Sequence, residues 1–129
     1  MYTFKKAERL KSKKAIDRLF AEGARFYVDP FQVVHAAEPF DSDSPARLLV
    51  SVPRKKIRKA VRRNLLKRRI REAYRLNKNP FLETLLLHHR FCTFALVYAT
   101  GKIADYKEIE EKIILILKRL QKEYEKADQ

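Results

Sequence analysis

The chain has 129 residues, of which 46% are hydrophobic, and it carries 30 Lys and Arg against 16 Asp and Glu, a formal net charge of +14. This length predicts a single domain over residues 1–129, and the hydrophobic content is enough for a packed core, which argues against a disordered chain. The charge predicts a polyanionic partner, with RNA, DNA and an anionic membrane surface as the candidates.

The cysteine content and the hydropathy indicate the compartment. One cysteine, Cys92, excludes an internal disulfide framework, and its apolar surroundings in the sequence predict a buried, unreactive thiol. The first residues lack the apolar stretch of a secretory signal, and no apolar run approaches the ~18 residues of a membrane span. We therefore expect a cytoplasmic protein.

A short amphipathic helix is predicted from Ser12 to Glu22, after a basic arm over residues 1–11. Its apolar residues recur at helical spacing, and Ser12 is suited to be its N-cap. Gly23 would end the helix in the left-handed backbone conformation, which glycine adopts at low cost.

Two strands are predicted next, at residues 26–37 and 46–53, joined as a hairpin by the turn at residues 38–45. Pro30 interrupts the first strand, so this strand should lie at an edge of the sheet or bend there. One face of this strand would carry Phe31, Val33 and His35, and the other Gln32, Val34 and Ala36.

The second half of the chain predicts two long helices around one buried strand. The first helix spans Ile57–Asn77 and ends at an Asn-Pro pair; residues 81–90 are ambiguous and could form a short helical turn. Residues 90–100 are apolar and β-branched, typical of a buried strand. A capping pattern at Asp105 begins the C-terminal helix, whose end, residues 118–129, can fray. The order αββαβα predicts an α+β fold.

The positive charge is concentrated between Arg54 and Lys78. This segment holds thirteen basic residues and one acid, Glu72, so its net charge is +12 and the rest of the chain sums to +2. A helical wheel separates a cationic side for a partner from an apolar side for the sheet. The apolar side holds Val61, Leu65, Leu66, Ile70, Ala73 and Leu76, with Tyr74 at its border.

A polyanion is the favoured partner for the cationic side. Arginine binds two phosphate oxygens at once through its planar fork. A salt-bridged, solvated surface is disfavoured because the segment has so few acids, and a membrane-surface helix because its apolar side lacks Trp and Phe. Arg62 and Arg69 interrupt the apolar side, so they either extend past it or contact RNA from its flank. Asn64 could orient neighbouring arginines, contact a ribose or base edge, or be merely solvated.

Residues 51–75 resemble the signature of the bacterial ribonuclease P protein subunit. That family carries R-N-R-x-K-R-x-x-R-E on its main helix, after a strand and a K-K-x-x-x-A-V lead-in. The lead-in is matched by Lys55, Lys56, Ala60 and Val61, and the motif by Arg63, Asn64, Lys67, Arg68, Arg71 and Glu72. The third motif position, usually Arg, is Leu65, so one RNA contact is lost or supplied by Arg62, Arg68 or Arg69. Ile16 stands where the first helix of the family often has Phe.

The resemblance implies an αββαβα, sandwich-like domain with a mixed sheet and a left-handed βαβ crossover, although the general rule favours the right-handed sense. It also implies the protein subunit of an endoribonuclease whose catalytic RNA, with Mg2+, removes the 5′ leader of precursor tRNA. The implied RNA-binding residues are Arg54, Lys55, Lys56, Lys59, Arg62, Arg63, Asn64, Lys67, Arg68, Arg71 and Arg75.

The same resemblance implies a cleft for the 5′ leader between the first helix and the sheet. The residues expected there are Arg9, Lys13, Phe20, Phe31 and Val33. Stacking of a base on an aromatic residue would contribute ~1–3 kcal/mol. The two phenylalanines and the valine could equally be ordinary core residues.

No catalytic residue is expected in the protein itself. His88 and His89 are adjacent and face different ways, and His35 stands alone in a strand, so the sequence offers no set of metal ligands. We expect no cofactor on the protein, Mg2+ with the RNA subunit, and a monomeric protein. Two alternatives are a non-catalytic RNA-binding protein of the ribosomal type and an enzyme that cleaves RNA by itself.

Overall fold

The elements of the fold follow the hydrophobic pattern, with one more strand and one more helix than the sequence predicted. The computed structural model describes residues 6–38 and 44–126, so most of the turn predicted at 38–45 lies outside the described residues. The elements are η1 (Lys6–Glu8), α1 (Lys13–Glu22), β1 (Ala24–Val28), β2 (Phe31–Glu38), β3 (Ala46–Ser51), α2 (Ala60–Asn77), α3 (Asn79–Leu87), β4 (Phe91–Tyr98) and α4 (Tyr106–Lys126). The predicted α+β class is confirmed.

The four strands form one mixed sheet in the order β1-β2-β4-β3. β1 and β4 pair antiparallel with β2, and β3 pairs parallel with β4. The predicted hairpin of residues 26–37 with 46–53 is therefore wrong, because β4 lies between them. The strand predicted at 26–37 is in fact two strands, since the cis Asp29–Pro30 bond lies in the turn between β1 and β2.

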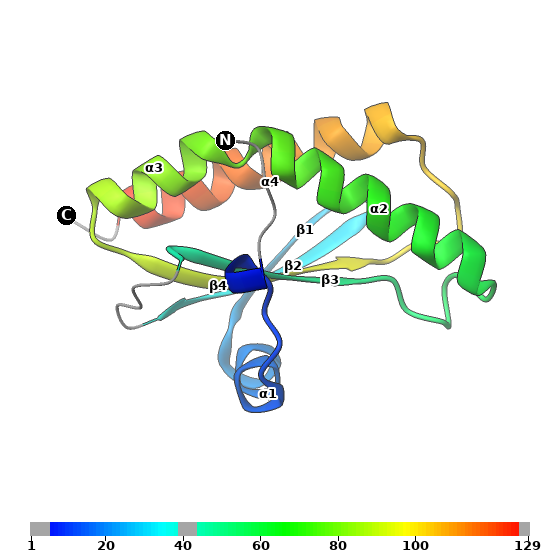
Figure 1. Cartoon of the computed structure of the whole chain (residues 1–129), viewed down its shortest axis with the longest axis horizontal. Coiled ribbons are helices and arrows are strands. Elements are labelled where there is room, and N and C mark those ends of the chain that lie inside the picture. Colours follow the sequence, from blue (N-terminus) through cyan, green and yellow to red (C-terminus); the bar gives the residue numbers. More distant parts are fainter. Residues whose placement is uncertain (1–5, 39–43, 127–129) are drawn as a thin grey trace.

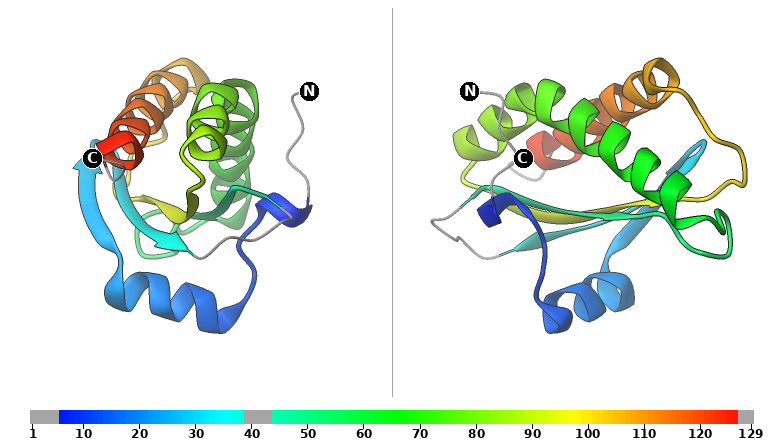
Figure 2. Two further views of the ribbon diagram at one scale, coloured as in Figure 1. Left: turned by 90° about the vertical axis from the view of Figure 1, so that its left-hand side faces the viewer. Right: turned by 45° about the vertical axis from the view of Figure 1, so that its right-hand side comes forward.

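The connection from β3 to β4 runs through α2 and α3 and is left-handed, as the family resemblance implied. The left panel of Figure 2 looks along β3 and β4 as they run away from the viewer. The chain rises from β3 to the helices above the sheet and returns to β4 on the left of β3. This crossover places α2 directly above the β3 edge of the sheet.

The sheet has a different cover on each face (Figure 1). Helices α2, α3 and α4 lie on one face, and α1 alone lies on the other. Phe31 and Val33 point into the main core below α2–α4, whereas Val34 points to the smaller core under α1. The predicted alternation along β2 is confirmed.

The predicted caps at the starts of α1 and α4 are confirmed, and the predicted conformation of Gly23 is wrong. Ser12 caps α1, since its Oγ accepts from the amide of Ala15 at 3.3 Å, and the Asp105 cap of α4 is present at 2.9 Å. The prediction for Gly23 is wrong, because its φ is −68° rather than left-handed. Glycine is needed there for space: a Cβ would lie 2.5 Å from the carbonyl oxygen of Leu19.

The predicted boundaries of the basic helix also shift. α2 begins at Ala60, and Ile57, its predicted first residue, is buried in the preceding turn. Pro80 lies in the first turn of α3, where its missing N–H has no helical partner to lose, so residues 79–87 are a full helix.

The chemistry of the isolated cysteine and histidines is simple. Cys92 is buried, as predicted, and burial raises the pKa of its thiol to about 12. His88 and His89 lie in the turn after α3. In residues 6–38 and 44–126, no three His, Cys, Asp or Glu side chains gather as metal ligands, and no helix is long and apolar enough to cross a membrane.

Candidate nucleic-acid interface

The loop before α2 holds a group of cations at the end of the molecule. The amides of Lys56 and Ile57 donate to the Pro53 carbonyl at 3.0 and 3.1 Å, and the buried Ile57 side chain anchors the turn. Arg63 Nη1 donates to the carbonyls of Ile57 and Arg58 at 3.0 and 2.6 Å. The loop thus presents exposed cations from a fixed backbone; they are Arg54, Lys55, Lys56, Arg58 and Lys59.

The buried face of α2 is narrower than the helical wheel predicted. Leu66, Ile70, Ala73 and Tyr74 are buried. Val61 is 79% exposed and Leu76 39% exposed, so their predicted packing against the sheet is wrong. The first turn of α2, with Val61, extends past the ends of the strands (Figure 1), where there is no sheet to cover it.

The outer face of α2 carries the cationic row, which we define as Asn64, Lys67, Arg68 and Arg71. Arg62 is also exposed, but it lies on another side of the helix, where it lines a separate pocket with Ile57 and Ile103. Asn64, Arg68 and Arg71 are exposed, and Lys67 is half-buried. The spacing of three and four residues places the members of the row along one side of the helix. The row is therefore an accessible line of charge.

Other cations of the segment are engaged within the protein. Arg69 Nη1 donates to the carbonyl of Ala104 at 2.6 Å, so Arg69 extends from α2 toward the start of α4. Arg75 pairs with Glu72 through two hydrogen bonds of 2.5 and 3.1 Å. Lys78, predicted on the cationic side, is instead buried in an ion pair with Glu8.

The basic N-terminal arm joins the cationic row in space. The amide of Leu10 donates to the Leu48 carbonyl at 3.0 Å, and Arg9 forms an isolated parallel β-bridge with Leu48. The arm therefore lies along the free edge of β3. This brings Arg9 to Arg71, whose pKa is lowered by partial burial and by the like charge of Arg9. Two neighbouring guanidinium groups on one surface favour an anionic ligand.

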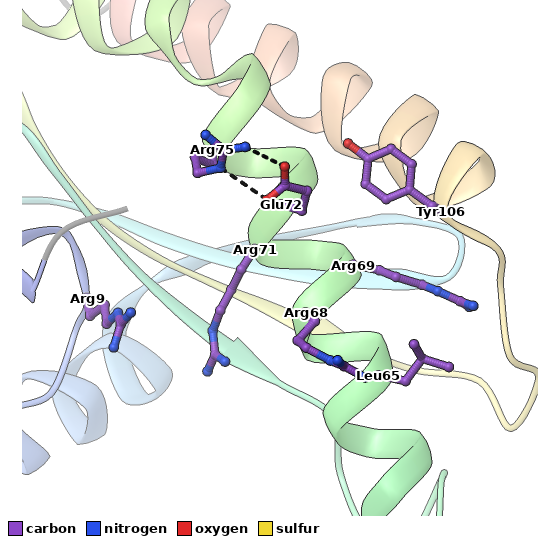
Figure 3. A pocket seen from close by; sticks show the side chains of 8 residues that line it. All are labelled: Arg9, Leu65, Arg68, Arg69, Arg71, Glu72, Arg75 and Tyr106. Carbon is purple, nitrogen blue, oxygen red and sulfur yellow. Dashed lines mark hydrogen bonds and ion pairs between the residues drawn. The ribbon is translucent and has the colours of Figure 1, made fainter. Parts of the chain in front are cut away.

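A pocket of about 550 Å³, the α2 pocket, lies along the outer side of α2 (Figure 3). It is lined by Arg9, Leu65, Arg68, Arg69, Arg71, Glu72, Arg75 and Tyr106. A second pocket, of about 260 Å³, lies between the arm, β3 and α2 and shares Arg9 and Arg71 with the first. The surface from the arm to the start of α4 is thus hollowed and arginine-rich.

The comparisons with known proteins agree on one family. Residues 4–121 match the family model described as Ribonuclease P. The chain belongs to the ribonuclease P protein family. A ribonuclease P protein component of Porphyromonas gingivalis is 36% identical over 105 residues, which is 81% of this chain and 77% of the relative. That of Petrotoga mobilis is 34% identical over 119 residues, covering 92% and 96% of the two chains.

Solved structures of the ribonuclease P protein family have the same fold. The RNase P protein from Thermotoga maritima superposes with a TM-score of 0.69 at 27% identity, covering 87% of this chain and 96% of the other. The protein from Staphylococcus aureus superposes with a TM-score of 0.65 at 25% identity, covering 92% and 93%.

The leader cleft implied by the ribonuclease P resemblance is only partly assembled from the expected residues. Arg9 and Lys13 are exposed and Phe20 is half-buried in α1. Phe31 and Val33 are fully buried on the opposite face of the sheet, below α2–α4, so their assignment to the cleft is wrong. The β2 residues on the α1 face of the sheet are Val34 and Ala36.

Several residues at these surfaces were not predicted. Leu49 and Val97 are half-buried on the α1 face of the sheet, and strict alternation from Val34 and Ala95 would have found that face. Nothing in the sequence places Tyr106 in the α2 pocket, because the first residue of α4 contacts α2 only in the folded chain.

Proposed function

We propose that this chain is the protein subunit of ribonuclease P and binds the catalytic RNA through the cationic row and the loop before α2. The observation that carries the proposal is the row of exposed cations on α2 in a chain that matches the family over residues 4–121. The complex would remove the 5′ leader of precursor tRNA in the cytoplasm and release the mature 5′ end.

In this proposal the protein contributes electrostatics and positioning. Mg2+ held by the RNA subunit supplies the hydrolytic chemistry. Arg68 and Arg71 neutralise phosphates, which lowers the repulsion between two RNA molecules brought together on one protein. The Arg63 side chain fixes the backbone of the loop before α2 before the RNA arrives, so less ordering entropy is lost on binding.

We also propose that the 5′ leader lies against α1 and the exposed part of the sheet beside it. Lys13 and Arg9 supply charge to a single strand there. Phe20 supplies an aromatic surface, with the Arg25 guanidinium carbon 5.8 Å from the centre of its ring. Leu49 and Val97 replace the residues first expected from β2 as the apolar floor.

Reconstitution tests the proposed function. The protein is mixed with a bacterial ribonuclease P RNA and precursor tRNA at a low Mg2+ concentration, where the RNA alone cleaves slowly. We expect the protein to accelerate cleavage, and a variant with Arg68 and Arg71 both changed to Ala to accelerate it less. No acceleration by the wild-type protein would refute the proposal, as would cleavage by the protein without any catalytic RNA.

Leader binding needs a separate measurement. The assembled complex should bind precursor tRNA more tightly than mature tRNA, and Phe20→Ala should reduce that difference. Equal affinities for the two tRNAs would instead indicate a general RNA-binding protein of the ribosomal type.

A further inference from the structure

The α2 pocket has an apolar part that a phosphate does not need. Leu65 and Tyr106 are half-buried and lie on the same side of α2 as Arg69, while Arg71 and Arg9 lie on the other side (Figure 3). A ligand that fills the whole pocket must therefore be flat or apolar at one end and anionic at the other. A nucleotide has this arrangement.

The ring of Tyr106 is held in place by α4 and α2 together. Its hydroxyl donates to Glu110 Oε2 at 3.1 Å, and the same oxygen accepts from Asn77 Nδ2 at 3.0 Å. Asn77 in turn donates to the carbonyl of Ala73 at 2.8 Å. The ring is thus oriented before any ligand binds, which reduces the entropy lost on stacking.

The charges around the ring suit an RNA. Partial burial and the hydrogen bond to Glu110 raise the pKa of Tyr106 to about 12, so the ring is neutral at physiological pH. Glu72, the one acid of the pocket, is paired with Arg75. Arg69 is tied to the carbonyl of Ala104, and its planar guanidinium lies on the same side of α2 as Leu65 (Figure 3).

We propose that Leu65, Tyr106 and Arg69 bind one unpaired nucleobase of an RNA whose phosphates lie on Arg68 and Arg71. This inference rests on the proposed function and adds a base-binding site to it. Bases stack on aromatic rings and guanidinium planes through their π-faces, whichever base is present. A free phosphate would leave Leu65 and Tyr106 unused, and a hydrocarbon would make no use of the exposed Arg68 and Arg71. The volume of about 550 Å³ lies within the usual range for small-ligand sites.

The test compares two single-stranded RNA probes of equal charge. One is a ten-nucleotide oligoadenylate, and the other is the same ribose-phosphate chain without bases. We expect Tyr106→Ala to weaken oligoadenylate binding by about five-fold to about a hundred-fold, the range expected for loss of one stacked base. It should leave affinity for the abasic chain and the salt dependence of binding unchanged, because no charge is removed.

Three further variants separate stacking from folding. Tyr106→Phe keeps the ring and should keep base discrimination, and circular dichroism monitors the fold of each protein. Tyr27→Ala, which removes an exposed tyrosine from β1, should leave both affinities unchanged. Leu65→Arg fills the apolar end with a cation, so base discrimination should fall while the salt dependence steepens by about one unit.

The outcomes distinguish this inference from the proposed function. If Tyr106→Ala discriminates between the two probes as well as the wild-type protein does, the base site is refuted, although RNA binding stands. If the wild-type protein binds neither probe, the base site is refuted, and the reconstitution assay still decides the proposed function by itself. Two further measurements identify which RNA supplies the base: the affinity of Tyr106→Ala for the catalytic RNA alone, and the affinity of its complex for precursor tRNA. If Tyr106→Ala lowers neither affinity, the base site is also refuted.

Discussion

At the scale of the residue, the cations of the basic segment divide into two groups with different roles. Arg68 and Arg71 are exposed on the outer face of α2. Arg69 and Lys78 are bonded to the Ala104 carbonyl and to Glu8. The charge of the residues cannot distinguish the two groups, because both consist of cationic side chains. The groups are distinguished by the partners that each side chain has in the fold. Substitutions in the two groups should therefore affect different measurements.

The exposed group should determine the salt dependence of RNA binding. Arg68→Ala and Arg71→Ala should each flatten the slope of log affinity against log salt by about one unit, since each removes one phosphate contact. Filter binding of the catalytic RNA between low and moderate salt measures this slope. Lys118→Ala, an exposed cation on α4, is the matched control and should leave the slope unchanged. An unchanged slope in Arg68→Ala would mean that this residue faces solvent in the complex.

His35 should make stability depend on pH. Burial lowers its pKa, with Glu123 opposing and Arg119 adding to the shift, and its Nδ1 lies 3.4 Å from the Tyr124 hydroxyl. Below the unfolded pKa of about 6.5 the unfolded chain binds the proton more readily, so the free energy of unfolding falls as pH decreases from there through the folded pKa. Urea unfolding at pH 7.5 and 5.5 should show this loss, and His35→Gln should show a smaller one. An identical loss in the variant would assign it to other groups.

At the scale of the element, the contact between the end of α1 and β2 fixes the helix on the open face of the sheet. Gly23 follows α1 directly, and a Cβ there would lie 2.5 Å from the Leu19 carbonyl oxygen and 2.9 Å from Val34 Cγ1. Neither atom belongs to a long flexible side chain, so neither can move without disturbing α1 or β2. The position of α1, and with it of Phe20, depends on this close approach.

Gly23→Ala should therefore destabilise the protein, by about 1–3 kcal/mol as in other overpacked sites. Gly101→Ala is the matched control, because a Cβ there would meet only the Lys56 carbonyl oxygen at 3.6 Å, an ordinary contact. Chemical denaturation of both variants measures the difference. Equal stabilities would show that α1 can move away from β2 at little cost.

At the scale of the whole molecule, the ion pair of Glu8 with Lys78 joins the N-terminal arm to the junction of α2 and α3. The two side chains are only 10% and 4% exposed. The Lys78 ammonium also lies 5.9 Å from the centre of the Tyr74 ring. Because Arg9 is the next residue in the chain, this pair holds it beside Arg71 and completes the arginine-rich surface.

Lys78→Met should cost about 3–5 kcal/mol of stability, because it leaves the Glu8 carboxylate buried without its cation. The double variant with Glu8→Gln should recover much of that loss, since no isolated charge is then buried. Thermal and urea unfolding of the single and double variants measure both effects. A single variant as stable as the wild-type protein would show that the pair is not needed to hold the arm.

Much of the fold could be predicted from local patterns. The N-cap at Ser12, the alternation along β2 and the buried strand at Phe91–Tyr98 depend on neighbouring residues, and all were found. The pairing of the strands could not be predicted, because β3 and β4 are adjacent only through the connection formed by α2 and α3. The error over Phe31 and Val33 has the same origin: alternation separates two faces but does not say which one α1 covers.

The sequence by itself determined that this chain carries a concentrated cationic helix and belongs to an RNA-associated family, because charge density and the motif around Arg63 and Asn64 are local properties. The tertiary structure decided which cations are accessible. It buried Lys78 against Glu8, tied Arg69 to Ala104, and brought Arg9 and Tyr106 to α2 from distant parts of the chain. The physical reason is that packing between elements decides whether a cation is accessible and which charges lie together, and no single segment specifies that packing.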